Sequence, residues 1–166
     1  VTKISVKKSR KSAAEKKGAG KKGKTFAIGA HDLYPDAVAC LSTLKAKGYY
    51  VGIVGNQPAS AEPTLRTSGL DFDFIATSDG WGVAKPDPKF FDKVRDAAGC
   101  AADQIAYVGD RVDNDVLPSL SAGMRPILVR RGPWGRAQWH WPEAEKAHLR
   151  VESLSELPRR LHELLR

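Results

Sequence analysis

Three aspartates stand close together directly after a short apolar run, at Asp110, Asp113 and Asp115. The run 105–108 is typical of a strand buried on both faces, and Gly109 permits a turn at its carboxyl end. Carboxylates this close repel one another unless water or a hard cation such as Mg²⁺ compensates their charge. Asp110, at the strand end, is therefore expected to bind a metal, whereas Asp113 is expected in the acidic first turn of the next helix.

Polar residues also follow a second strand-like segment and precede a helix. Asn56 comes after the apolar residues 51–54, where its amide either orients a substrate oxygen or forms a turn before the following proline. Lys85 lies between a glycine-containing loop and a proline-led helix start. Its ammonium is therefore either held at a definite place or solvated at the surface.

In order along the chain, the segments Gly55-Asn56, Lys85-Pro86-Asp87-Pro88 and Gly109 to Asp115 resemble the motifs of the haloacid-dehalogenase superfamily. That superfamily comprises magnesium-dependent phosphohydrolases built on a Rossmann-like sheet. The resemblance covers residues 33–129. It implies a mechanism in which one aspartate attacks phosphorus and a second, two residues later, protonates the leaving oxygen.

The resemblance also implies a role for each matching residue. Mg²⁺ is the expected cofactor, with Asp110 as its ligand and Asp115 as a second ligand or as support for the first. Lys85 is the expected cation that steadies nucleophile and phosphate. Gly55 replaces the hydroxyl-bearing residue that contacts the phosphoryl oxygens, so this contact is expected from the backbone or from Asn56. The expected substrate is a small phosphorylated metabolite.

The first motif of the superfamily, an apolar strand that ends in Asp-x-Asp, is missing before Leu33. The upstream strand candidate is 25–28, and Asp32 is the carboxylate that remains as a candidate for catalysis. Two explanations stay open. Either the protein is truncated before its nucleophile, or it is a catalytically degenerate domain that binds a metal, a phosphate or a partner.

The net charge of +8 is concentrated at the amino end of the chain. Residues 1–24 hold ten Lys or Arg against one Glu, whereas the rest is nearly neutral. Too few large apolar residues are present there to offset the entropy of ordering, so a disordered basic tail over 1–24 and one α/β core domain over 25–166 are expected. The tail either attaches to nucleic acid by charge, without sequence preference, or is a solubilising or mis-started amino end. The second is favoured, because no aromatic residue is interleaved for base stacking.

Neither a secretory apolar region nor a run of eighteen apolar residues occurs in the sequence. A membrane partner is therefore not expected. Cys40 and Cys100 lie far apart, without a partner at metal-binding spacing. This usage favours a reduced, cytoplasmic protein with two structural thiols.

Helix-like and strand-like segments alternate from Leu33 onward, which predicts a Rossmann-like α/β fold with a parallel sheet, helices on both faces and a cap that is absent or minimal. Near the carboxyl end a helical turn, a short edge strand and a last helix are expected. The predicted helices are 35–47, 61–68, 88–98, 116–122 and 154–165; the predicted strands are 49–54, 72–76, 105–108, 126–129 and 149–151.

The segment after the last main strand carries two arginines and three tryptophans. Arg130 and Arg131 either bind an anionic substrate or form surface salt bridges, and the salt bridges are favoured. Trp134, Trp139 and Trp141 form either a lid or, as is commoner, a loop folded over its own aromatic side chains.

Overall fold

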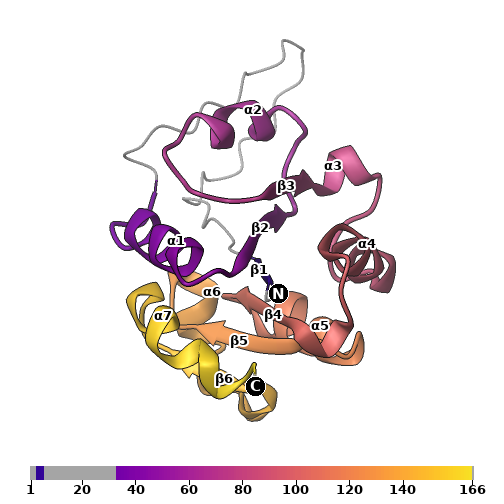
Figure 1. The fold of residues 1–166 in the computed structure, drawn as a ribbon. Helices are drawn as coiled ribbons and strands as arrows, with labels where there is room; N and C mark the ends of the chain where they lie inside the picture. The colour runs from indigo at the N-terminus through magenta and orange to yellow at the C-terminus, as the bar shows by residue number, and fades with distance from the viewer. Residues whose placement is uncertain (1–2, 6–32, 166) are drawn as a thin grey trace, which may run out of the picture.

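Six parallel strands form one sheet in the order β3-β2-β1-β4-β5-β6 (Figure 1). The structure is a computed structural model that describes residues 3–5 and 33–165. The predicted Rossmann-like α/β fold is confirmed, and its parallel strands all end at one edge of the sheet. The strands are β1 (Lys3–Ser5), β2 (Tyr50–Gly55), β3 (Phe74–Thr77), β4 (Ile105–Gly109), β5 (Arg125–Val129) and β6 (Leu149–Val151).

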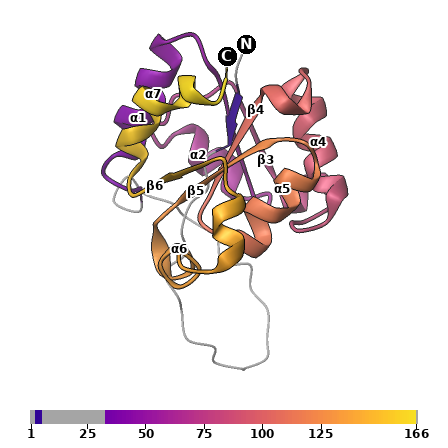
Figure 2. The same ribbon diagram turned by 90° about the horizontal axis from the view of Figure 1, so that it is seen from below.

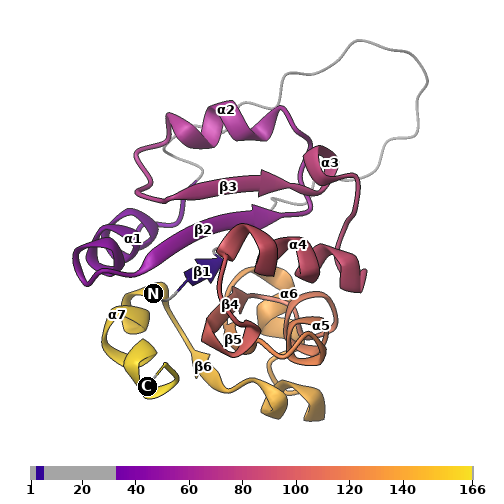
Figure 3. The same ribbon diagram turned by 45° about the vertical axis from the view of Figure 1, so that its right-hand side comes forward.

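The central strand β1 lies in the segment predicted to be a disordered tail, and for residues 3–5 that prediction is wrong. Figure 3 shows β1 between β2 and β4. Ile4 pairs in register with Val51 of β2 and with Ala106 of β4. A gap between β2 and β4 would leave backbone donors and acceptors unpaired, which a short β-prone segment can satisfy. The alternative first strand at 25–28 lies outside the described residues, as do 6–24.

Helices cover both faces of the sheet, as predicted. Figure 2 places α1 and α7 on one side and α4 and α5 on the other. Within the described part of the chain, no element forms a separate cap. The helices are α1 (Ala37–Ala46), α2 (Ala61–Arg66), α3 (Ser78–Trp81), α4 (Pro88–Ala98), α5 (Leu117–Ser121), α6 (Gly132–Ala137) and α7 (Leu157–Arg160); shorter turns are η2 (Ala102–Gln104), η3 (Val112–Val116), η4 (Pro142–Lys146), η5 (Leu154–Glu156) and η6 (Leu161–Glu163).

Alternation along β4 shows why this strand is apolar throughout. Ile105 and Tyr107 pack into the layer formed with α4, whereas Ala106 and Val108 pack into the layer formed with α1 and α7. Successive side chains of a strand point to opposite faces, so a strand covered on both sides needs apolar residues at every position. The buried run therefore delivers the next polar residue, Asp110, at a rigid strand end.

Two predicted helices are divided in the structure. The segment predicted as a helix over 116–122 is preceded by η3, a π-helical turn, before α5 begins at Leu117. The segment predicted as a helix over 154–165 is split into η5, α7 and η6. Pro118 and Pro158 both stand near the amino ends of their short helices, where the missing N–H is tolerated.

Both cysteines are free thiols. Cys40 is buried in α1, and burial together with the nearby Asp36 carboxylate raises its pKa to about 12. A thiol with this pKa stays protonated at neutral pH, which agrees with a structural role. Among the described residues, no helix is both long and apolar enough to cross a membrane.

Candidate functional site

Polar side chains gather at the carboxyl edge of the sheet, where β2, β3 and β4 end. Asn56 follows β2, Ser78 follows β3 and Asp110 follows β4. Ligands of open parallel sheets bind outside the carboxyl ends of the strands. The strand-end positions of Asn56 and Asp110, which were predicted from the sequence, therefore share the edge on which a site is expected.

Lys85 joins this edge through its backbone, which the Asn56 side chain holds. The Lys85 N–H donates to Oδ1 of Asn56 over 2.8 Å, and Nδ2 of Asn56 donates to the Lys85 carbonyl over 2.9 Å. A primary amide presents an acceptor and a donor side by side, so both bonds form at once. Asn56 thus fixes the loop that carries Lys85, a role that sequence reasoning missed because the two residues lie 29 positions apart. Its contact with a substrate oxygen stays a prediction.

The Lys85 ammonium points into the protein and pairs with Asp115. Nζ lies 2.5 Å from Oδ1 of Asp115, and the two side chains are 0% and 1% exposed. Nζ also lies 5.8 Å from the ring centre of Phe90 and 5.6 Å from that of Tyr107, at distances where aromatic faces attract cations. Lys85 is therefore held at a definite place and is not a solvated surface lysine.

Asp115 is fixed by the π-helical turn η3 and by the absence of a side chain at Gly109. Its Oδ2 accepts a hydrogen bond from the Arg111 N–H over 3.1 Å. A Cβ added at Gly109 would lie 2.3 Å from Cβ of Asp115, far inside contact distance. Gly109 is thus required for space: it lets the Asp115 carboxylate lie over the end of β4.

Asp110 is buried, with 8% exposure, directly beyond β4. Helix α6 lies against its backbone, because a Cβ added at Gly135 would come within 3.2 Å of the Asp110 carbonyl oxygen. Magnesium takes oxygen ligands and usually keeps several waters beside one or two carboxylates. Asp110 supplies the fitting donor, whereas Asp115 already accepts hydrogen bonds on both oxygens and suits a supporting role.

A complete metal cage is not present in the described segments. No group of three His, Cys, Asp or Glu side chains that could hold a metal ion occurs within them. A metal site at the Asp110–Asp115 loop therefore stays a prediction. Asp32, the candidate for catalysis, lies outside the described residues.

Asp113 is not a member of the ion pair and binds other side chains. Arg111 donates to it through Nε over 2.9 Å and also through Nη2, and Gln138 donates through Nε2 over 3.1 Å. The hydrogen bond from Arg111 lowers the pKa of Asp113, against the opposing effect of partial burial. Asp113 thus lies in the first turn of η3, as predicted, and binds side chains of its surroundings.

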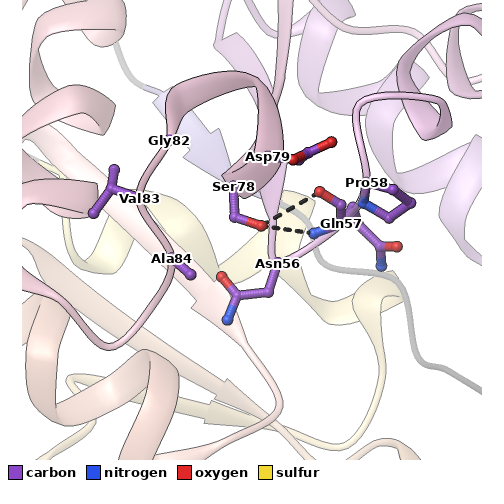
Figure 4. Close-up of a pocket in the computed structure, with 8 residues that line it drawn as sticks. All are labelled: Asn56, Gln57, Pro58, Ser78, Asp79, Gly82, Val83 and Ala84. Carbon is purple, nitrogen blue, oxygen red and sulfur yellow. Dashed lines mark hydrogen bonds between the residues drawn. The ribbon is translucent and has the colours of Figure 1, made fainter.

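An open pocket of about 570 Å³ lies beside this arrangement, between the loops after β2 and β3. Figure 4 shows Asn56 and Ser78 on its wall, with the Ser78 hydroxyl bonded to the backbone of Gln57. Ala84 also lines it and directly precedes Lys85. The pocket therefore adjoins the loop that carries Lys85, and it has room for a small organic group.

The two arginines after β5 form ion pairs, the outcome favoured from the sequence. Nη2 of Arg131 lies 2.5 Å from Oδ2 of Asp36, and its guanidinium stacks 4.0 Å from the Tyr34 ring centre. Arg130 pairs with Glu152 over 3.2 Å at the surface. Both arginines thus have carboxylate partners within the protein.

The tryptophans that follow lie in and after α6, a helix that the sequence did not predict. The guanidinium groups of Arg130 and Arg150 lie 5.5 and 4.2 Å from the ring centre of Trp139. Trp134 lies 4.6 Å from the Arg111 guanidinium and remains half-exposed. Trp139 is thus partly covered, whereas Trp134 and Trp141 are 51% and 43% exposed, so the choice between a lid and a loop folded over its own aromatic side chains stays a prediction.

The comparisons with known proteins agree with the geometry. The family model of haloacid dehalogenase-like hydrolases matches residues 7–123. The chain is 34% identical over 138 residues to a haloacid dehalogenase-like hydrolase domain-containing protein 3 of Danio rerio, covering 78% of this chain and 53% of the relative. It is 31% identical over 128 residues to a glyceraldehyde 3-phosphate phosphatase of Methanocaldococcus jannaschii, covering 75% and 54%.

A solved structure is similar over most of the described fold. The crystal structure of an HAD phosphatase from Thermococcus onnurineus superimposes with a TM-score of 0.66 at 28% identity, over 82% of this chain and 62% of that chain. The chain thus spans about half the length of the two relatives and less than two thirds of this structure.

Proposed function

The chain belongs to the haloacid dehalogenase-like hydrolase family, and from this premise we propose that it carries a phosphoryl-transfer site that hydrolyses a small phosphorylated metabolite with Mg²⁺ as cofactor. The observation that carries the proposal is the buried pair of Lys85 and Asp115, held by Asn56 at the strand edge that also bears Asp110. Removing two charges from water can cost more free energy than their attraction to each other returns. A functional use of the cation explains why the pair is kept.

Lys85 supplies positive charge at the edge of the sheet. An ammonium has three donor hydrogens, and the bond to Asp115 uses one of them. The others can bind the attacking carboxylate and a phosphoryl oxygen as negative charge develops on them. Because Asn56 fixes the backbone of Lys85, only the atoms that cover its 0% exposed side chain have to move for a substrate to reach this charge.

The carboxylate of Asp110 would bind the metal, and Asp115, in the same loop, would support the Asp110 carboxylate. When bound, Mg²⁺ supplies neutralisation of charge on the phosphoryl oxygens. For the attacking group, Asp32 is the candidate in this chain. The alternative is a catalytically degenerate domain of the same family that binds a metal, a phosphate or a partner without turning over an ester.

The pocket beside Asn56 would accept the part of the substrate that leaves with the ester oxygen. Asp79 lines it, and Glu62 accepts a hydrogen bond over 2.9 Å from Thr77, the residue before the lining residue Ser78. No lysine or arginine is among the residues that line the pocket. A leaving group with hydroxyl or amino groups suits this wall, whereas one with a carboxylate or a second phosphate would be repelled.

Release of inorganic phosphate from glycerol phosphate, with and without Mg²⁺, tests the proposal on the full chain. We expect magnesium-dependent turnover that Asp110→Asn and Lys85→Met both abolish. Asp92→Asn, which changes an exposed carboxylate of α4, is the matched control and should leave turnover unchanged. Turnover that survives Asp110→Asn would refute the assignment, and magnesium binding without any turnover would favour the binding domain.

A further inference from the structure

Gln138 connects α6 to the loop that carries the two site carboxylates. It is 1% exposed and follows the last residue of α6. Its Oε1 accepts the Val112 N–H over 2.6 Å, and its Nε2 donates to Oδ1 of Asp113 over 3.1 Å. Both ends of the amide are therefore used, one on the backbone and one on a side chain of the same turn.

The residues that Gln138 binds lie inside the turn that orients Asp115. The N–H groups of Asp115 and Val116 both donate to the Arg111 carbonyl, over 3.0 and 3.1 Å, and the Arg111 N–H donates to Asp115. Val112 and Asp113 are the first residues enclosed by these bonds. Fixing them fixes the direction in which the Asp115 carboxylate leaves the turn.

Helix α6 is itself fixed against the strand ends. A Cβ at Gly135 would come within 2.7 Å of the Val129 carbonyl oxygen and 3.2 Å of that of Asp110. The helix backbone therefore contacts the ends of β4 and β5 directly. Through its two hydrogen bonds, Gln138 holds the Asp110–Asp115 loop in a fixed position relative to α6.

We infer that Gln138 is a positioning residue for the site: by tying the loop to α6 it directs Asp115 toward Lys85 and holds Asp110 at the end of β4. The inference rests on the proposed function. Gln138 acts through Val112 and Asp113. Outer partners that orient metal ligands typically contribute tenfold to a hundredfold in metal affinity or activity.

Variants that exchange the hydrogen-bond donor and acceptor between positions 138 and 113 distinguish a positioning role of Gln138 from a role in packing alone. Gln138→Glu keeps an acceptor for the Val112 N–H but sets a carboxylate against that of Asp113. When Asp113→Asn is added, the new amide at position 113 can donate to the carboxylate at position 138. The net charge of the two side chains beside Arg111 is then the same as in the wild-type protein. Leu161→Ala, which truncates a buried leucine on the opposite face of the sheet, is the control for loss of stability alone.

Three measurements on the full chain decide the question: amide hydrogen exchange over residues 111–116, Mg²⁺ affinity by calorimetry, and kcat and KM for glycerol phosphate. For Gln138→Glu we expect faster exchange in the turn and a loss of about tenfold or more in Mg²⁺ affinity and kcat, with KM changed less. The double variant should recover to within about threefold. Leu161→Ala should lower the melting temperature without these effects.

Equal losses of stability in Gln138→Glu and Leu161→Ala, with exchange in the turn, Mg²⁺ affinity and kcat unchanged, would show that Gln138 is only structural. Lack of Mg²⁺ binding and turnover by the wild-type chain would instead overturn the proposed function. Hydrogen exchange would still decide in that case: faster exchange in Gln138→Glu and its recovery in the double variant support positioning, and unchanged exchange refutes it.

Discussion

Lys85 Nζ lies 2.5 Å from Asp115 Oδ1 in a region from which water is almost entirely excluded. Removing one member leaves the other charge buried without its partner, a change that typically costs about 3–5 kcal/mol. We therefore expect Lys85→Met and Asp115→Asn each to lower the free energy of unfolding by that amount. The double variant should lose clearly less than the sum. Urea unfolding of the four proteins measures the coupling, and additive losses would contradict it.

Asn56→Ala should lower stability by about 1–3 kcal/mol, because the N–H and carbonyl of Lys85 lose their partners together. Asn56→Asp should not restore the loss, since a carboxylate cannot donate to the Lys85 carbonyl. Gln57→Ala is the neighbouring control: its side-chain oxygen accepts no hydrogen bond from the described residues, and a change below about 0.5 kcal/mol is expected. Equal effects at both positions would argue against the assigned role of Asn56.

Gly109→Ala should destabilise the fold by more than about 2 kcal/mol and displace Asp115, because the new Cβ would lie 2.3 Å from that of Asp115. Gly55→Ala is the matched substitution at the end of β2. There the nearest atom would be Cγ of Gln57 at 3.7 Å, an ordinary contact. Thermal unfolding compares the two, and a similar melting temperature for both would contradict the steric argument.

The contacts of Asp36 are expected to stabilise the folded protein at neutral pH, and this stabilisation should disappear in acid. Burial raises its pKa, but the hydrogen bonds from Arg131 and Ser153 outweigh this and hold the pKa below the ordinary value of 3.8. A carboxyl whose pKa is lower in the folded state stabilises the protein above its unfolded pKa, and this stabilisation is lost as pH falls through the folded pKa. Asp36→Asn should therefore weaken the protein near pH 7 and reduce the pH dependence of stability below about pH 4.

Asp92→Asn, at an exposed aspartate, is the control. Its free energy of unfolding should fall in acid as it does in the wild-type protein. If Asp36→Asn leaves the curve unchanged as well, the contacts of Asp36 do not stabilise the folded state.

Asp79→Asn should change which substrates are accepted. Removing the carboxylate from the pocket wall is expected to raise kcat/KM several-fold for phosphate esters whose leaving group bears a carboxylate, such as phosphoglycolate. The value for glycerol phosphate should change little. A parallel change for both esters would show that Asp79 acts on the fold and not on the charge of the leaving group.

Local patterns explain why most of the fold could be predicted. Helix α4 begins at Pro88 and ends before Gly99 because proline suits a first turn and Gly99 adopts a left-handed conformation. The apolar run before Gly109 likewise predicted both β4 and the placing of Asp110 at its end. In each case neighbouring residues determine the structure.

Contacts between distant parts of the chain could not be predicted in this way. Nothing near Gln138 indicates that its amide is buried against the turn after β4, and nothing near Asn56 indicates that it binds the peptide group of Lys85. Strand β1 was missed for a similar reason. Its three residues lie among lysines, and only the gap between β2 and β4 makes them a strand.

The position of β1 also bears on the order of folding. Its partners Tyr50 and Ile105 lie on the order of fifty and a hundred residues further along the chain, and closing such long loops costs entropy before any pairing is gained. The pairs β2–β3 and β4–β5 close much shorter loops and can form earlier. The strand at the centre of the finished sheet is therefore expected to dock last, joining two preformed halves.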